Sequence, residues 1–117
     1  MLRDERPEAG VEQPPIWSHE VTRRSGHVVI ALAGELDLAC TAALQALLFE
    51  HIESGQVTDL HIDLADVGFL DSSALGMLIS GLNHAQEQGC RFAVINPSPM
   101  ARRVLAITGL DDVLLQP

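Results

Sequence analysis

Apolar and polar positions along the chain change between a period of two, which is typical of strands, and a helical period of three to four. Residues 16–21 give a weak strand pattern, and a Ser-Gly turn separates it from 27–33, which is apolar at nearly every position. Such a run is typical of a strand that helices cover on at least one face. Residues 60–64 alternate apolar side chains with His61 and Asp63, and residues 91–95 give a further strand.

Three stretches between and after these strands have helical spacing. Residues 40–52 carry one apolar stripe and stop at a Ser-Gly pair, and residues 73–88 carry another that Gly89 closes. Residues 100–108 follow two prolines and end at Gly109, and residues 113–115 make a short final element. The order strand, strand, helix, strand, helix, strand, helix predicts crossover connections between parallel strands.

The fold class that follows is α/β: one domain with a mixed sheet of four to five strands and three or more helices packed on it. We expect this domain to span residues 16–117. Residues 1–15 are rich in proline and charge and lack periodicity, so we expect a flexible N-terminal tail.

Charge is the unusual feature of the composition. The 117 residues include 16 acidic and 7 basic ones, every basic residue is arginine, and the formal net charge is −9. An acidic surface repels phosphate backbones and anionic lipid, so we expect no direct nucleic-acid partner and no membrane partner. Without lysine, neither Schiff-base chemistry nor a P-loop is available.

Cofactor and targeting signals are also missing from the sequence. Cys40 and Cys90 lie far apart without zinc-ligand spacing, so we expect reduced core thiols, no metal and no cofactor. No apolar run approaches the roughly 20 residues that cross a bilayer. The N-terminus has no apolar signal segment, so we expect a cytoplasmic protein.

The most informative segment is 66–77, which lies between a predicted strand and a predicted helix. Ser72 has two interpretations there. It is a suitable N-cap, as are its two neighbours, or it is a phosphate acceptor beside the N–H groups of the helix. A nucleophilic serine is disfavoured because the Gly-x-Ser-x-Gly elbow is absent and no histidine has a motif around it. We therefore expect no enzymatic activity.

Acidic and small residues surround Ser72 in the predicted fold. Asp71 adjoins Ser72. Asp37 or Thr41 caps the first helix, or Asp37 lies across the sheet edge from Ser72, because adjacent parallel strands end at one edge. Ser73, Gly76, Met77 and Ser80 share the helix face away from the leucines. This face either packs on neighbouring elements of the chain or docks a partner, with Met77 as an adaptable contact.

The acidic residues are also expected to gather near this serine. Five of them are predicted in or near the strand ends that flank Ser72. These residues are Glu35, Asp37, Asp63, Asp66 and Asp71. A phosphoryl group there adds about −1.5 to −2 charges, and the pattern predicts a partner with a compensating basic surface.

Three segments together resemble the STAS domain family, and specifically its anti-sigma factor antagonists. Residues 33–37 (Ala-Gly-Glu-Leu-Asp) are similar to the family's Gly-Glu-hydrophobic-Asp, and residues 71–76 to its Asp-Ser-Ser/Thr-Gly-Leu-Gly. Residues 104–110 are similar to its last helix and hydrophobic-Thr/Ser-Gly-Leu turn. Ala74 departs from the family's commonest residue there, glycine, which bears on how closely a partner backbone can approach.

The resemblance implies a regulatory protein without catalysis. Its unphosphorylated form binds an anti-sigma factor, often a serine kinase of the histidine-kinase-like ATPase type, and so frees a sigma factor. The kinase phosphorylates the serine that corresponds to Ser72, and a serine phosphatase reverses this. Asp37 and Asp71 match the acidic positions near that serine. The alternative is a STAS scaffold without a phosphoswitch, such as a subunit of a lipid-transport ATPase or a sensory complex.

Overall fold

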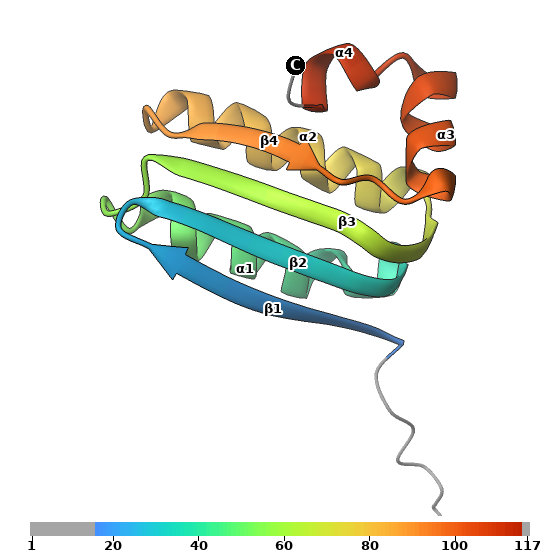
Figure 1. Cartoon of the computed structure of the whole chain (residues 1–117), viewed down its shortest axis with the longest axis horizontal. Coiled ribbons are helices and arrows are strands. Elements are labelled where there is room, and N and C mark those ends of the chain that lie inside the picture. Colours follow the sequence, from blue (N-terminus) through green and yellow to red (C-terminus); the bar gives the residue numbers. More distant parts are fainter. Residues whose placement is uncertain (1–15, 116–117) are drawn as a thin grey trace, which may run out of the picture.

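A four-stranded sheet organises the molecule (Figure 1). The computed structural model describes residues 16–115, so the predicted tail at 1–15 lies outside the described residues. Strands β1 (Trp17–Arg24), β2 (His27–Leu36), β3 (Asp59–Leu70) and β4 (Arg91–Ile95) lie side by side in chain order. β1 is antiparallel to β2, whereas β2, β3 and β4 are parallel. The predicted mixed sheet is confirmed.

Helices connect the parallel strands and follow the last one. A short 3-10 helix, η2 (Leu38–Cys40), precedes α1 (Thr41–Glu53), and α2 (Ser72–Glu87) joins β3 to β4. The chain ends with α3 (Pro99–Thr108) and α4 (Asp111–Leu114). The predicted final element is therefore a four-residue helix, followed by one parallel bridge between Leu115 and Val94 rather than by a fifth strand.

Both crossover helices cover the same face of the sheet (Figure 1). Successive right-handed crossovers that advance in one direction place their helices on one side. Alternate residues of β2 and β3 face these helices and form the core with the leucines of α1 and α2. The largest fully buried side chains are Ile30, Leu32, Leu36, Leu44, Leu48, Leu60, Ile62, Leu64, Leu78, Leu105, Leu114 and Val28. Among the described residues, no helix covers the opposite face.

β3 is more than twice as long as the predicted 60–64. Its pairing with β2 shifts by one residue between Ala31 and Ala33 and again between Gly34 and Glu35. In both places β3 contains the extra residue, which is a β-bulge that interrupts the period of two. The alternation that predicted the strand therefore fails at residue 65, although the pairing continues to Leu70.

Gly34 is required where β2 passes the start of β1. Its φ is +96°, and a Cβ at this position would overlap the carbonyl oxygen of Ile16. Only glycine combines this conformation with this close approach. The glycine of the Gly-Glu-Leu-Asp segment thus lets β2 reach Leu36 and deliver Asp37 to the edge of the sheet.

Candidate functional site

The ends of β2 and β3 meet at one edge of the sheet. Asp71, which follows β3, donates its backbone N–H to the carbonyl oxygen of Leu36, the last residue of β2, over 3.1 Å. Its side chain then accepts a hydrogen bond from the N–H of Leu38 at 3.2 Å. The structure therefore brings the segments that carry Asp37 and Asp71 together, as their positions after adjacent parallel strands predicted.

Asp71 is the N-cap of α2. Its Oδ1 accepts the Ala74 N–H at 3.0 Å, while its Oδ2 takes the bond from Leu38. One carboxylate thus satisfies an orphan N–H of the helix and fixes the loop after β2 against it. The alternative in which Ser72 is the cap is wrong, because Asp71 supplies this bond.

Ser72 is the first residue of α2 and is exposed. Among the described residues, its hydroxyl has no hydrogen-bond partner. It stands at the positive end of the helix dipole, where backbone N–H groups lack partners within the helix. The neighbouring Ser73 is half-buried. Of the two serines, Ser72 is the more exposed.

Asp37 holds the turn that follows β2. Its Oδ1 accepts the Ala39 N–H at 3.0 Å and caps η2, a 3-10 turn that the sequence did not predict. Thr41, the other expected cap, donates its hydroxyl to the Leu38 carbonyl oxygen at 2.9 Å instead. Cys40 is buried behind this turn, and burial followed by the charges of Asp37 and Asp71 raises the pKa of its thiol.

Two large apolar side chains near the ends of β2 and β3 are exposed. Leu38 is 70% exposed and Phe69 is 45% exposed. Leu38 contacts Asp71 through its backbone, and Phe69 follows the second bulge of β3 at Gly68. Sequence reasoning missed both residues, although each lies within two residues of an acidic motif position. We call Leu38, Phe69 and Met77 the apolar rim; Met77 is half-buried and packs on the core.

The small-residue face of α2 is open. Gly76 and Ser80 are exposed, and a Cβ on Gly76 would meet no atom within 4 Å. Close internal packing therefore does not explain the glycine at position 76. Ala74, the departure from the family motif, is fully buried, so its methyl group faces the core and not a partner.

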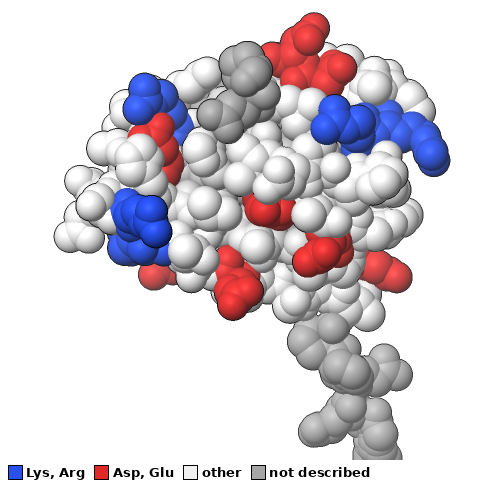
Figure 2. Space-filling view, in the orientation of Figure 1, with Lys and Arg blue, Asp and Glu red and all other residues white. Residues whose placement is uncertain are grey.

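Acidic side chains are less concentrated at this site than the sequence indicated. Asp63 and Asp66 lie within β3, since that strand continues to Leu70. Asp63 accepts bonds from the Ala65 N–H at 2.8 Å and the Asn96 amide at 3.0 Å. Figure 2 shows acidic side chains dispersed over the uncovered face, with the arginines towards its margins. Of the five acids, Asp37 and Asp71 lie where the ends of β2 and β3 are joined, and Glu35 pairs with Phe69 one residue before the end of β2.

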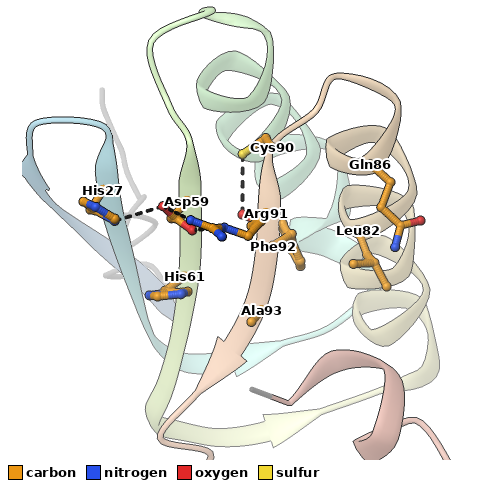
Figure 3. A pocket seen from close by; sticks show the side chains of 9 residues that line it. All are labelled: His27, Asp59, His61, Leu82, Gln86, Cys90, Arg91, Phe92 and Ala93. Atoms are coloured by element: carbon orange, nitrogen blue, oxygen red, sulfur yellow. Dashed lines mark hydrogen bonds and ion pairs between the residues drawn. The ribbon is translucent and has the colours of Figure 1, made fainter. Parts of the chain in front are cut away.

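A second polar cluster lies at the opposite end of β3, beside an open pocket of about 580 Å³ (Figure 3). Asp59 is 6% exposed, and its carboxylate accepts bonds from Arg91 at 2.6 and 3.2 Å. Thr58 donates to it at 3.1 Å, and His27 Nδ1 lies 3.0 Å away. These partners, Arg91 first, lower the pKa of Asp59 despite its burial. The sequence did not predict this cluster.

Several negative findings concern residues 16–115. No three His, Cys, Asp or Glu side chains in this range come together in a way that could hold a metal ion. Cys40 and Cys90 are free and buried, as expected, and burial raises the pKa of both thiols. No helix in this range is long and apolar enough to cross a membrane.

Comparison with known proteins identifies the family. The family model described as "Mlab, STAS domain" matches residues 19–116. An anti-sigma F factor antagonist of Lysinibacillus sphaericus is 34% identical over 95 residues, which are 81% of this chain and 80% of that protein.

Two solved structures of SpoIIAA, each 27% identical, share the fold. The unphosphorylated form, an anti-sigma factor antagonist, has a TM-score of 0.73 and is covered over 86% of this chain and 88% of that one. The phosphorylated form, a Bacillus cell fate determinant, has a TM-score of 0.68, with 86% and 91% covered. Matched over nearly all of the described domain, this chain belongs to the STAS domain family.

Proposed function

We propose that the protein is an anti-sigma factor antagonist that phosphorylation of Ser72 switches off. In its unphosphorylated form it binds an anti-sigma factor of the serine-kinase type and thereby releases a sigma factor. The bound kinase transfers one phosphoryl group from ATP to the Ser72 hydroxyl, and a serine phosphatase removes it. The chain itself supplies a surface and an acceptor, and no catalytic group.

The observation that carries this proposal is the division of roles between Asp71 and Ser72. Asp71 caps α2 and joins the two loops, so the Ser72 hydroxyl is exposed and has no structural bond among the described residues. Relatives with this fold are anti-sigma factor antagonists, and SpoIIAA occurs in unphosphorylated and phosphorylated forms. Both facts favour a switch over a scaffold, which has no use for an exposed acceptor.

The expected docking surface combines the apolar rim with the open face of α2. Exposed apolar side chains of this size at a loop edge are typical of a protein contact. Gly76 leaves room for a partner backbone, since nothing lies within 4 Å of the position of its missing Cβ. Asp37 and Asp71 add negative charge next to Ser72, so the matching surface of the partner is expected to be basic.

Phosphorylation changes this surface more than it changes the fold. The N-terminal N–H groups of α2 favour a phosphoryl group, so the helix remains intact. The partner, however, meets an added charge of about −1.5 to −2 beside two carboxylates. A mismatch of about 3 kcal/mol would weaken binding more than a hundredfold.

The direct test is to mix the protein with a kinase-type anti-sigma factor of its own organism and ATP, and to measure intact mass. We expect one phosphoryl group on the wild type and on Ser73→Ala, and none on Ser72→Ala. Ser73→Ala is the matched control because it removes the neighbouring hydroxyl from the same helical turn. Modification of Ser72→Ala to the wild-type extent would overturn the assignment, and binding without any modification would favour the scaffold alternative.

A further inference from the structure

The two edges of the sheet differ in how they are protected. The outer edge of β4 is five residues long and is closed in part by the bridge between Val94 and Leu115. β1 forms the other edge and is eight residues long, and every residue in it except Trp17 is exposed. It pairs with β2 without a register shift and contains no proline. Among the described residues, nothing pairs with its outer side.

The hairpin turn determines which backbone groups point outwards. A two-residue turn, Ser25-Gly26, joins β1 to β2, so the flanking pair Arg24 and His27 is hydrogen-bonded. Even-numbered residues of β1 therefore bond to β2, in agreement with the bond of 2.8 Å from Glu35 N–H to the Ile16 carbonyl oxygen. The backbone groups of His19, Val21 and Arg23 point away from the sheet, and no partner for them lies within residues 16–115.

The side chains of this edge have charges that complement those of a second, antiparallel copy of β1. Glu20, Thr22 and Arg24 share the uncovered face of the sheet, because they pair with Ala31, Val29 and His27 of β2. In an antiparallel pairing of two β1 strands centred on Thr22, each Glu20 lies opposite the Arg24 of the other copy. The shifted pairing centred on Glu20 sets two glutamates opposite each other, and the one centred on Val21 sets His19 opposite Arg23.

We propose that β1 is a docking edge for a second copy of this chain, in the antiparallel register centred on Thr22. Val21 and Arg23 of each copy would then form about four backbone hydrogen bonds across the two-fold axis. The two Glu20–Arg24 pairs fall at non-hydrogen-bonded positions, where opposite side chains lie closest. The sheets join into one of eight strands, and the two Ser72 edges point in opposite directions.

A contact through one strand edge is small, so the dimer is expected to be weak. We expect the dimer to appear in sedimentation equilibrium between about 20 µM and 1 mM chain, as for other interfaces below the standard size. Val21→Pro should abolish it. The N–H of Val21 points outwards, so the proline removes a bond between copies and none within the hairpin. Thr22→Pro is the contrasting variant, because it removes a bond to β2 and should lower the melting temperature instead.

Charge reversal tests the register independently of any proline. Glu20→Arg places two arginines opposite each other and should weaken the dimer roughly tenfold. The double variant Glu20→Arg/Arg24→Glu restores opposite charges and should return the affinity to within about threefold of the wild type. Glu50→Arg, an exposed change of the same charge on α1, is the control and should not weaken it.

Three results would overturn the proposal. A chain that stays monomeric up to about 1 mM does not bind a second copy. A dimer that survives Val21→Pro uses another surface. If the double variant dimerises as weakly as Glu20→Arg, the two β1 strands pair in a different register. None of these results bears on Ser72, so failure here leaves the proposed function untouched.

Discussion

An aspartate lies near each end of β3, and the two aspartates differ in burial and in hydrogen-bond partners. Asp59, at the start, is nearly buried, and Arg91, His27 and Thr58 surround its carboxylate. Asp71, just after the end, is half-buried, and its partners within the described part of the chain are the backbone N–H groups of Leu38 and Ala74. Asp59 forms an ion pair with Arg91 and links three strands, whereas Asp71 has no ion pair among the described residues and lies next to an exposed serine. The difference separates a carboxylate that links three strands from one that caps a helix and joins two loops at the proposed docking surface.

Removing the buried carboxylate should have the largest effect on stability. Asp59→Ala removes the hydrogen bonds from Arg91 and Thr58, so the free energy of unfolding should fall by about 2–3 kcal/mol. Urea denaturation measures this loss. Asp59→Asn is the matched control, because it keeps the shape but not the charge, and it should lose less. A loss below about 0.5 kcal/mol for Asp59→Ala would mean that the cluster does not stabilise the sheet.

Stability should depend on pH through the same residue. The folded-state pKa of Asp59 lies below its ordinary value. Its contribution is therefore complete above the unfolded pKa of about 3.9 and disappears as the pH falls through the folded value. The stability difference between the wild type and Asp59→Asn should be constant from about pH 5 to 7 and shrink below about pH 4. A difference that grows on acidification would contradict this assignment.

Removing the helix cap should cost less. Asp71→Ala loses the hydrogen bonds from the N–H groups of Ala74 and Leu38, so the free energy of unfolding should fall by about 1–2 kcal/mol. Asparagine also caps helices well, so Asp71→Asn should stay within a few tenths of a kcal/mol of the wild type. This pair of variants separates the capping role from the charge. If both lose equally, the charge and not the hydrogen bonding holds the edge together.

The smallest change is expected at Gly76 and has the opposite sign. Alanine is preferred to glycine inside a helix by about 1 kcal/mol, and an added methyl group meets no atom within 4 Å. Gly76→Ala should therefore stabilise the free protein by up to about 1 kcal/mol in thermal or urea unfolding. The same variant should bind the anti-sigma factor less tightly if a partner backbone lies close to this face. Unchanged binding would place the partner elsewhere.

The sequence predicted most of the frame because local patterns encode it. Leucine spacing marked α1 and α2, the glycines at 89 and 109 marked helix ends, and adjacent parallel strands placed Asp37 and Asp71 at one edge. Both glycines have φ near +75°, as C-terminal helix caps require. The predicted α/β class with a mixed sheet is confirmed by the fold that the chain shares with SpoIIAA.

Features that depend on contacts between distant segments were not predictable. The bulges of β3 exist only in its pairing with β2, and they expose Phe69. Asp59 and Arg91 are 32 residues apart, and no local motif links them. The sequence offered three capping residues at 71–73, and only the structure shows that Asp71 is the one in use.

Calorimetric binding of the kinase-type anti-sigma factor to the wild type, Ser72→Ala and Ser72→Asp tests the proposed switch at Ser72 most directly. Ser72→Ala should bind within about threefold of the wild type, because the exposed hydroxyl has no structural bond among the described residues. Ser72→Asp places a negative charge beside Asp37 and Asp71 and should bind at least roughly tenfold more weakly, and phosphorylated wild type more than a hundredfold. Equal affinities for the wild type, both variants and the phosphorylated protein would rule out the proposed switch.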